Sequence, residues 1–341
     1  MSVLHRVSPA TTAIYIICLF MASIDSRWIL IGGVGLGISL TSRFLAPNKN
    51  TFPRIFLVLV FLLCIGNYSA VLGAVWWGNG NWALTFSSVF WILPAVGVMF
   101  LADERVFPWL VGFAFIHGTF ILLTGTSDGL TYNSGLTHNS NVASGILVLA
   151  GIISIYKRYP VWVPLLLIAA VGFTQSRWAL LINSVMILAG CIYGHLRWRW
   201  FLALGVTVIL LVTVSDLTYR GYTSVESSLL ADAGRDIKIR LSYPDRPDLL
   251  PHGLVEHRGL HNVPLRMARE SGIITASIWI GLSVWALTQR RGSVWWWLML
   301  GVISLSMLDH YTWRPHLGAI WFLALGGIAT VYKTEVRKDN L

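Results

Sequence analysis

Long apolar runs dominate the chain and are separated by short polar connectors. Twelve of these runs are long enough, or nearly long enough, to cross a hydrocarbon core about 30 Å thick. They cover residues 11–24, 28–45, 54–74, 84–101, 107–124, 141–156, 160–174, 177–195, 198–215, 264–288, 293–309 and 315–332. Several connectors have only a few residues, so neighbouring helices must form antiparallel hairpins. The pattern predicts an all-α, polytopic membrane protein of about twelve transmembrane helices.

One long polar loop, residues 216–262, divides the chain into a part with nine spans, 1–215, and a part with three spans and a polar tail, 263–341. Within the loop, Ser224 can cap a helix that runs to about residue 241. Its apolar residues, spaced four apart, are Val225, Leu229, Ala233, Ile237 and Leu241. This spacing predicts an amphipathic helix lying across the bundle, although a solvated helix on the bundle's rim would show the same pattern.

Composition supports the membrane assignment. Hydrophobic residues make up 55% of the chain and charged residues 12%, and the mean hydropathy is +0.67. Soluble chains are about 25% charged. Cys18, Cys64 and Cys191 all lie in apolar runs, so no disulfide framework is implied. The first apolar run lacks a small-residue cleavage site and is expected to remain as a span.

The distribution of Lys and Arg predicts the orientation in the membrane. With the N-terminus in the cytoplasm, fourteen of the 25 basic residues lie on the cytoplasmic side, and the short outer connectors hold three. The cytoplasmic group is Arg6, Arg43, Lys49, Arg54, Arg105, Lys157, Arg158, Arg197, Arg199, Arg290, Arg291, Lys333, Arg337 and Lys338; the outer group is Arg27, Arg177 and Arg314. The other eight lie in or just past the long loop, to which the positive-inside rule does not apply. Both termini are therefore expected in the cytoplasm.

The net charge of +10 suits the anionic lipids of the inner leaflet, which attract Lys and Arg next to the membrane. Nucleic-acid binding is not expected, because the chain has no soluble basic domain. Three tryptophan clusters, at 76–77, 198–200 and 295–297, are interpreted as interfacial aromatic belts rather than as platforms for sugars.

The end of the long loop carries the candidate chemistry. Asn262 is a good helix N-cap, and Val263-Pro264 place a proline in the first turn, where its missing N–H costs nothing. An unbroken helix is expected from there to Leu287, polar for two turns and then apolar. His261 precedes it, and the helix dipole disfavours the charged imidazolium, which suits a proton acceptor. Alternatively, the helix simply begins with a polar residue at the membrane boundary.

Two other outer connectors carry polar residues beside spans. The segment 137–141, with His138 and Asn141, is polar enough for a short re-entry into the membrane. Arg177 begins span eight. An Arg at the end of a span is usually an anchor whose charged head reaches the surface. It lies, however, on the side that is poor in positive charge, which makes it a candidate anion ligand as well.

Several of these segments resemble motifs of one family. They are Thr174-Gln175-Ser176-Arg177, Gly234-Arg235, His261-Asn262-x-x-Leu265 with Glu270-x-Gly272, the segment from His138 to Asn141, and Asp309-His310-Tyr311-x-Trp313. On these residues the chain resembles the bacterial O-antigen ligase and O-antigen polymerase superfamily, membrane glycosyltransferases that use undecaprenyl-diphosphate-linked glycans. The resemblance covers most of residues 130–330. The chain departs from the family in being short and in having Pro251-His252-Gly253 where a glycine pair is usual.

The resemblance implies a GT-C-like fold with one large periplasmic loop in the bacterial inner membrane. It also implies that Arg177 and Arg235 bind the donor diphosphate and that His261 takes the proton of the acceptor hydroxyl, with inversion at the anomeric carbon. Further substrate contacts are expected from His138, Asn141, Lys238, Arg240, Arg258, Asn262 and His310. The partners would be a lipid-linked glycan donor, membrane lipids, and as acceptor either a lipid A-core or a second lipid-linked glycan.

Three interpretations remain open. A ligase and a polymerase use the same donor and the same activation, and the span count favours the ligase. A secondary transporter also fits twelve spans, but it would predict an internal repeat and paired interrupted helices, which the sequence does not show. No metal or other cofactor is expected, because the outer connectors show no carboxylate cluster. A site built from Asp245, Asp248 and Glu256 is the alternative.

The charge distribution yields a test of topology. Cysteine introduced at Ser242 is expected to react with a membrane-impermeant thiol reagent in intact cells whose outer membrane admits the reagent, because the 216–262 loop is predicted to be periplasmic. Labelling that requires lysis of the inner membrane would contradict this orientation.

Overall fold

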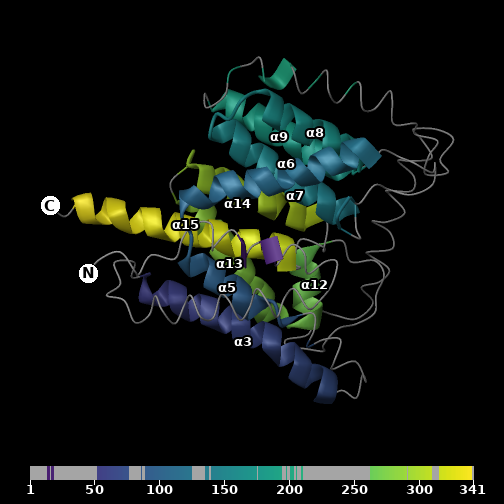
Figure 1. Cartoon of the computed structure of the whole chain (residues 1–341). Coiled ribbons are helices and arrows are strands. Elements are labelled where there is room, and N and C mark those ends of the chain that lie inside the picture. The colour runs from purple at the N-terminus through teal and green to yellow at the C-terminus, as the bar shows by residue number, and fades with distance from the viewer. Residues whose placement is uncertain are drawn as a thin grey trace, which may run out of the picture.

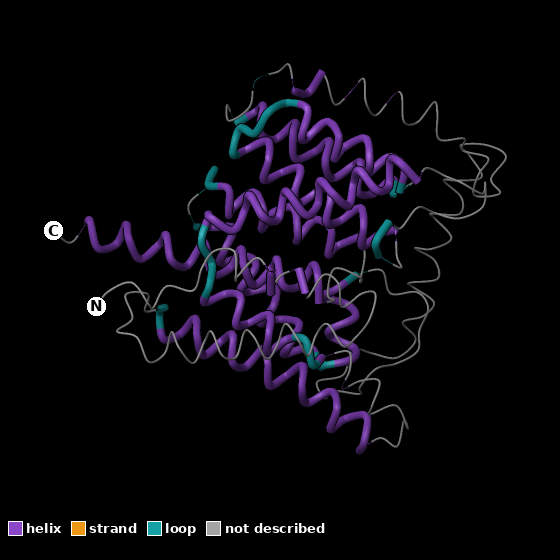
Figure 2. Tube along the Cα trace, in the orientation of Figure 1, coloured by secondary structure: helices purple, strands orange, loops and turns teal. Residues whose placement is uncertain are grey.

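The computed structural model describes residues 14–15, 17–18, 52–76, 86, 89–124, 135–137, 140–174, 176–193, 197, 200–202, 205, 209, 262–289, 291–308 and 315–339. Over these ranges the chain forms helices joined by turns, with no strand among them (Figures 1 and 2). The prediction of an all-α fold is confirmed for this part of the chain.

The helices follow the predicted apolar runs closely, because runs of apolar residues between polar breaks define helical spans. They are α3 (Arg54–Trp76), α5 (Ile92–Phe100), α6 (Phe107–Thr124), α7 (Ser140–Tyr156), α8 (Trp162–Phe173), α9 (Arg177–Ile192), α12 (Val263–Glu270), α13 (Ile273–Thr288), α14 (Val294–Leu308) and α15 (Pro315–Asp339), with a 3-10 turn η1 (Glu104–Val106) before α6. The bounds of α6 coincide with the predicted fifth span, 107–124.

Two helical segments in the described ranges, Arg54–Trp76 and Glu104–Thr124, could cross a membrane by length and composition. Six further apolar helices are shorter, with 10–17 residues each. The predicted spans 11–24, 28–45 and 198–215 lie largely outside the described residues. The apolar helices are consistent with association with a membrane, and the number of spans stays a prediction.

The centre of the bundle is formed by helices that are apolar all round, as expected for helices with no solvent face. Every residue of α7 from Val142 to Ile155 is buried, and so is every residue of α15 from Leu317 to Ala329. Figure 1 shows α7, α14 and α15 in the middle of the molecule, with α3 on one side and α8 and α9 on the other.

Aromatic pairs join these central helices. Trp279 of α13 stacks on Trp321 of α15 with ring centroids 5.9 Å apart, and Trp297 of α14 stacks on Tyr156 of α7 at 4.5 Å. The prediction of an interfacial belt is therefore wrong for Trp297, which is 0% exposed, and for Trp295, which is 2% exposed. Because α14 packs between α7, α9 and α15, these two rings meet neighbouring helices instead of the membrane boundary.

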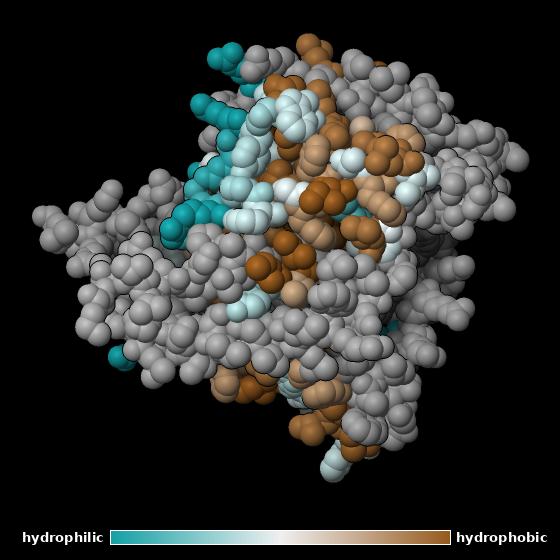
Figure 3. Space-filling view, viewed as in Figure 1, coloured by the Kyte–Doolittle hydropathy of each residue, from teal (hydrophilic) through white to brown (hydrophobic). Residues whose placement is uncertain are grey.

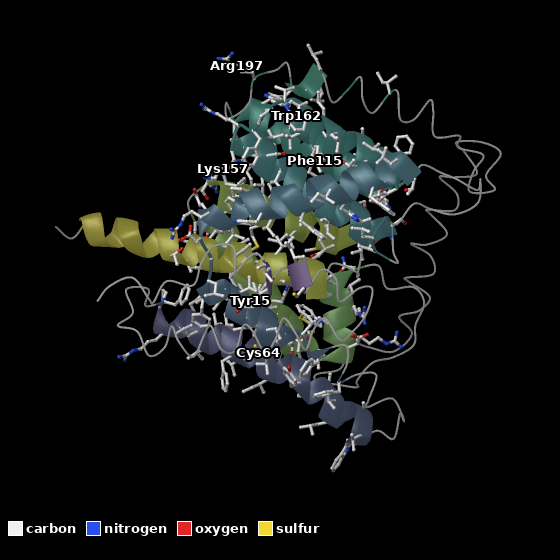
Figure 4. The ribbon with its side chains drawn as sticks, viewed as in Figure 1. Tyr15, Cys64, Phe115, Lys157, Trp162 and Arg197 are labelled. Atoms are coloured by element: carbon white, nitrogen blue, oxygen red, sulfur yellow. The ribbon has the colours of Figure 1, made fainter. Side chains whose placement is uncertain are left out.

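The outer surface of the bundle is apolar in the way that a lipid-facing surface is. On α6, Trp109, Ile116, Phe120 and Leu123 are exposed, and Figure 3 shows hydrophobic side chains gathered over this helix. Phe115 of the same helix meets Trp162 of α8 edge to face, with centroids 5.4 Å apart (Figure 4). Exposed apolar side chains grouped in this way are consistent with a surface that meets a membrane or another protein.

Charged residues gather at the end of the bundle where α6 begins. Arg105 donates to the Asp103 carboxylate at 2.6 Å, and the Lys157 ammonium pairs with Glu104. The Lys157 nitrogen also lies 5.7 Å from the centre of the Phe107 ring. Figure 4 shows Lys157 and Arg197 at this same end.

At the opposite end, α12 runs across the ends of the other helices (Figure 1). The predicted unbroken helix to Leu287 is therefore wrong, because α12 ends at Glu270 and α13 begins at Ile273. Gly272 between them has φ 89° and ψ 156°, a backbone conformation that is essentially restricted to glycine. This turn changes the direction of the chain, so the polar helix lies across the bundle before the apolar helix enters it.

The break gives a stability prediction. Gly272→Ala is expected to lower the free energy of unfolding by about 1–3 kcal/mol, because a Cβ is strained at this φ and ψ. The matched control is Gly281→Ala in the middle of α13, where a Cβ would meet nothing within 4 Å. That control should be neutral or stabilising by about 0.5–1 kcal/mol. Thermal unfolding in detergent measures both, and equal effects of the two variants would show that Gly272 carries no conformational requirement.

Candidate active site at the α12 end of the bundle

The start of α12 is built around the side chain of Asn262. Its Oδ1 accepts a hydrogen bond from the Leu265 N–H at 3.1 Å, and its backbone is extended, with φ −134°. Pro264 lies in the first turn, where a helix has N–H groups to spare. The predicted N-cap is therefore confirmed.

The same side chain joins α12 to α14. Asn262 Nδ2 donates to the carbonyl oxygen of Met307 at 3.0 Å. Met307 is one residue from the end of α14, so its carbonyl is one of the four that the helix itself leaves without a partner. Asn262 thus satisfies a donor of one helix and an acceptor of another, which places the start of α12 on the last turn of α14.

An ion pair lies on the polar side of α12. Arg266 Nε donates to Glu270 Oε1 at 2.8 Å, and the two side chains are 13% and 18% exposed. The adjacent face of the helix, with Val263, Pro264, Met267 and Ala268, is buried in the core, so the ion pair lies at the edge of the buried face. At this degree of burial the loss of one partner would leave a poorly solvated charge, so the pair holds both side chains in place.

The far end of α12 is tied to α3. Ser271 Oγ donates to Asn67 Oδ1 at 3.5 Å, and Asn67 Nδ2 donates to the Leu63 carbonyl at 2.8 Å. Thr275 Oγ1 donates to the Ser271 carbonyl at 2.8 Å. Side chains therefore supply hydrogen bonds to the backbone at the break between α12 and α13. Sequence reasoning missed Asn67, which is 2% exposed, although an amide in an otherwise apolar span was a visible signal.

Helices α7 and α9 pack along α14 and run antiparallel to it. A Cβ on Gly301 of α14 would touch Leu149 and Ile152 of α7 and lie 3.9 Å from Met186 of α9. Tyr156 at the end of α7 stacks on Trp297 near the start of α14 at 4.5 Å, and Tyr193 just after α9 meets the same ring edge to face at 6.3 Å. The N-termini of α7 and α9 therefore point toward the C-terminal end of α14. Asn141 is the second residue of α7 and partly buried, and Arg177 is the first residue of α9.

Three of the ten predicted site residues therefore lie toward one end of the bundle. They are Asn141, Asn262 and Arg177, and for Arg177 only the backbone position is described. The other seven, His138, Arg235, Lys238, Arg240, Arg258, His261 and His310, lie outside the described residues, as do the predicted loop helix and the side chain of Arg177. Asp245, Asp248 and Glu256 also lie outside them. Within the described ranges no three His, Cys, Asp or Glu residues are grouped as metal ligands would be.

The arrangement favours an anion. The N-termini of α7 and α9 point toward the end of α14 on which α12 lies, and the start of a helix carries backbone N–H groups and the positive end of the helix dipole. Phosphate is one of the anions that helix N-termini bind in proteins. Arg177 begins one of these helices, so the sequence places a guanidinium at the same end.

The comparisons with known proteins add no homologue to this picture. No family model, no curated protein and no solved structure matches the chain.

The two roles of Asn262 can be separated by substitution. Asn262→Asp keeps the oxygen that caps Leu265 but loses the donor to Met307, whereas Asn262→Ala loses both. The alanine variant is expected to cost about 1–2 kcal/mol from the cap and about 1 kcal/mol from the second hydrogen bond. Hydrogen exchange of the α12 amides should rank wild type as most protected, then Asp, then Ala.

The control for this experiment is Ser293→Ala. Ser293 Oγ accepts from the Trp296 N–H at 3.1 Å and caps the other end of α14. Its loss should increase exchange at the start of α14 and leave α12 unchanged. If Asn262→Asp and Asn262→Ala increase exchange in α12 equally, the bond to Met307 stabilises nothing.

Proposed function

We propose that the protein is a twelve-span glycosyltransferase of the bacterial inner membrane, with both termini in the cytoplasm and the α12 end at the periplasmic face. It transfers a glycan from an undecaprenyl-diphosphate donor to an acceptor hydroxyl. The preferred acceptor is a lipid A-core, which makes the protein an O-antigen ligase. A polymerase that uses a second lipid-linked glycan as acceptor shares the donor and the activation.

The observation that carries the proposal is the position of Asn262. The motif residues that suggest this chemistry are far apart in the sequence, from Asn141 through Arg177 to Asn262. The hydrogen bond from Asn262 to Met307 joins the last of these to the end of α14, and α7 and α9 run antiparallel to α14, so their first turns point toward that end. Segments that a lipid-diphosphate site would need together are therefore at one end of the bundle.

The proposed mechanism uses a leaving group that is already activated. The two guanidiniums of Arg177 and Arg235 hold the diphosphate oxygens, and the N–H groups at the helix starts add to this positive field. His261 accepts the proton of the acceptor hydroxyl as its oxygen attacks the anomeric carbon. The bond from that carbon to the diphosphate breaks, undecaprenyl diphosphate leaves, and a single displacement inverts the configuration.

A secondary transporter is the second candidate, and the break between α12 and α13 is the observation that favours it, because transporter sites use interrupted helices. In transporters, however, the break separates two apolar half-helices near the midplane. Here it separates an apolar helix from α12, which carries Arg266, Arg269 and Glu270 and lies across the bundle end. This arrangement fits a helix at the membrane surface better than a half-span.

Substitutions in the three proposed catalytic residues test the function. Arg177→Lys and Arg235→Lys are each expected to lower transfer from purified lipid-linked donor at least about tenfold, because a point charge does not replace a bidentate fork. His261→Ala should leave donor affinity nearly unchanged and lower kcat by about 10²–10⁴. Transfer by the wild type should be the same with and without EDTA.

The matched control is Arg197→Lys, an exposed arginine at the opposite end of the bundle, which should leave transfer unchanged. Loss of donor binding in His261→Ala would make His261 a phosphate ligand instead of a base. Near-normal transfer by folded His261→Ala would mean that this histidine only precedes a helix. Activity that disappears with EDTA and returns with Mg²⁺ would contradict the proposed metal-free mechanism.

A further inference from the structure

A turn between α6 and α7 is docked on a buried histidine of α6. The backbone N–H of Leu136 donates to Nδ1 of His117 at 3.3 Å. His117 is 0% exposed, and the neighbouring Thr137 is 5% exposed. Gly135 has φ 56°, and a Cβ on it would lie 2.6 Å from Cε1 of His117 and 2.7 Å from Ile121. Only glycine allows the chain to approach the imidazole this closely.

The turn returns into the bundle. His117 comes seven residues before Thr124, where α6 ends, which corresponds to about 10 Å along a helix. Its ring is parallel to that of Phe113, one turn earlier on α6, with centroids 6.3 Å apart. Gly118 beside it packs against Leu147 of α7 and Ala170 of α8. The chain therefore leaves α6, comes back to the level of its interior at Leu136, and then enters α7.

The hydrogen bond to Leu136 determines which nitrogen of His117 carries the proton. A neutral imidazole has one donor and one acceptor, so with Nδ1 accepting, Nε2 carries the hydrogen. Nε2 is buried and has no hydrogen-bond partner in the described part of the chain. An unpartnered buried N–H costs free energy, and an apolar side chain would fill this place without that cost. What the histidine supplies here is an acceptor for the Leu136 N–H.

We propose that His117 is a positioning residue of the donor site: its Nδ1 holds the turn Gly135–Thr137, and the turn sets where α7 begins. Asn141, in the first turn of α7 and only five residues after Leu136, was predicted to contact substrate. This inference rests on the proposed function, because it assigns the start of α7 to donor binding.

Two amide variants separate the two ring nitrogens. In His117→Asn the side-chain oxygen can take the place of Nδ1, whereas in His117→Gln the longer amide reaches the place of Nε2. His117→Leu removes both polar atoms and keeps the bulk. If the Leu136 N–H needs its acceptor, the asparagine variant should behave like the wild type within about threefold, and the other two should raise the KM for lipid-linked donor about tenfold with little change in kcat.

A second measurement reports on the turn without any enzymatic assay. Thr137→Cys is introduced into full-length protein in membranes and treated with an impermeant thiol reagent. The native cysteines Cys18, Cys64 and Cys191 are buried. The introduced thiol should be protected in the wild-type and His117→Asn backgrounds, and it should react about ten times faster in the His117→Leu and His117→Gln backgrounds. Thr124→Cys, at the exposed end of α6, should react equally in all four backgrounds.

The three variants distinguish the possible roles of His117. If His117→Gln keeps wild-type behaviour and His117→Asn does not, the role belongs to Nε2. If all three variants fail equally, the histidine is a packing residue. Either result overturns the proposal, and so does wild-type behaviour of all three variants. If wild-type protein transfers no glycan, the proposed function fails, and the reactivity of the thiol introduced by Thr137→Cys alone then decides whether His117 holds the turn.

Discussion

The side chain of Asn262 solves a problem that every apolar helix end presents: backbone N–H and C=O groups without partners cannot be left in an apolar environment. One amide caps the Leu265 N–H of α12 and also satisfies the Met307 carbonyl of α14. Because both bonds come from one side chain, the start of α12 cannot move away from α14 without breaking at least one of them. This contact fixes where α12 begins relative to α14.

A second hydrogen bond, from Ser271 to Asn67, attaches the other end of α12 to α3, so α12 connects α14 with α3. Gly272 then turns the chain into the bundle, so the eight residues of α12 lie across the helix ends while α13 enters the apolar interior. The first turns of α7 and α9 point toward the same end of α14 as the start of α12. The dipoles of α7 and α9 therefore make this end of the bundle more favourable for anions than the opposite end.

The sequence predicted the structure best where a feature depends on residues close together in the chain. Apolar runs predicted the bounds of α6 to the residue, and Asn262 with Pro264 predicted the start of α12. The break at Gly272 was missed because hydropathy does not report a backbone φ of 89°. The burial of Trp297 and the docking of Leu136 on His117 were missed for a different reason. Both depend on which helices become neighbours, and a single sequence does not contain that information.

The central claim is that the α12 end of the bundle binds a lipid diphosphate, and a structure of the protein with a non-hydrolysable donor analogue tests it most directly. The account predicts diphosphate density beside the first turns of α7 and α9 and the start of α12, with the Arg177 guanidinium in contact with the phosphate oxygens. Density at the opposite end, near Lys157 and Arg105, or no saturable binding of the analogue, would contradict it.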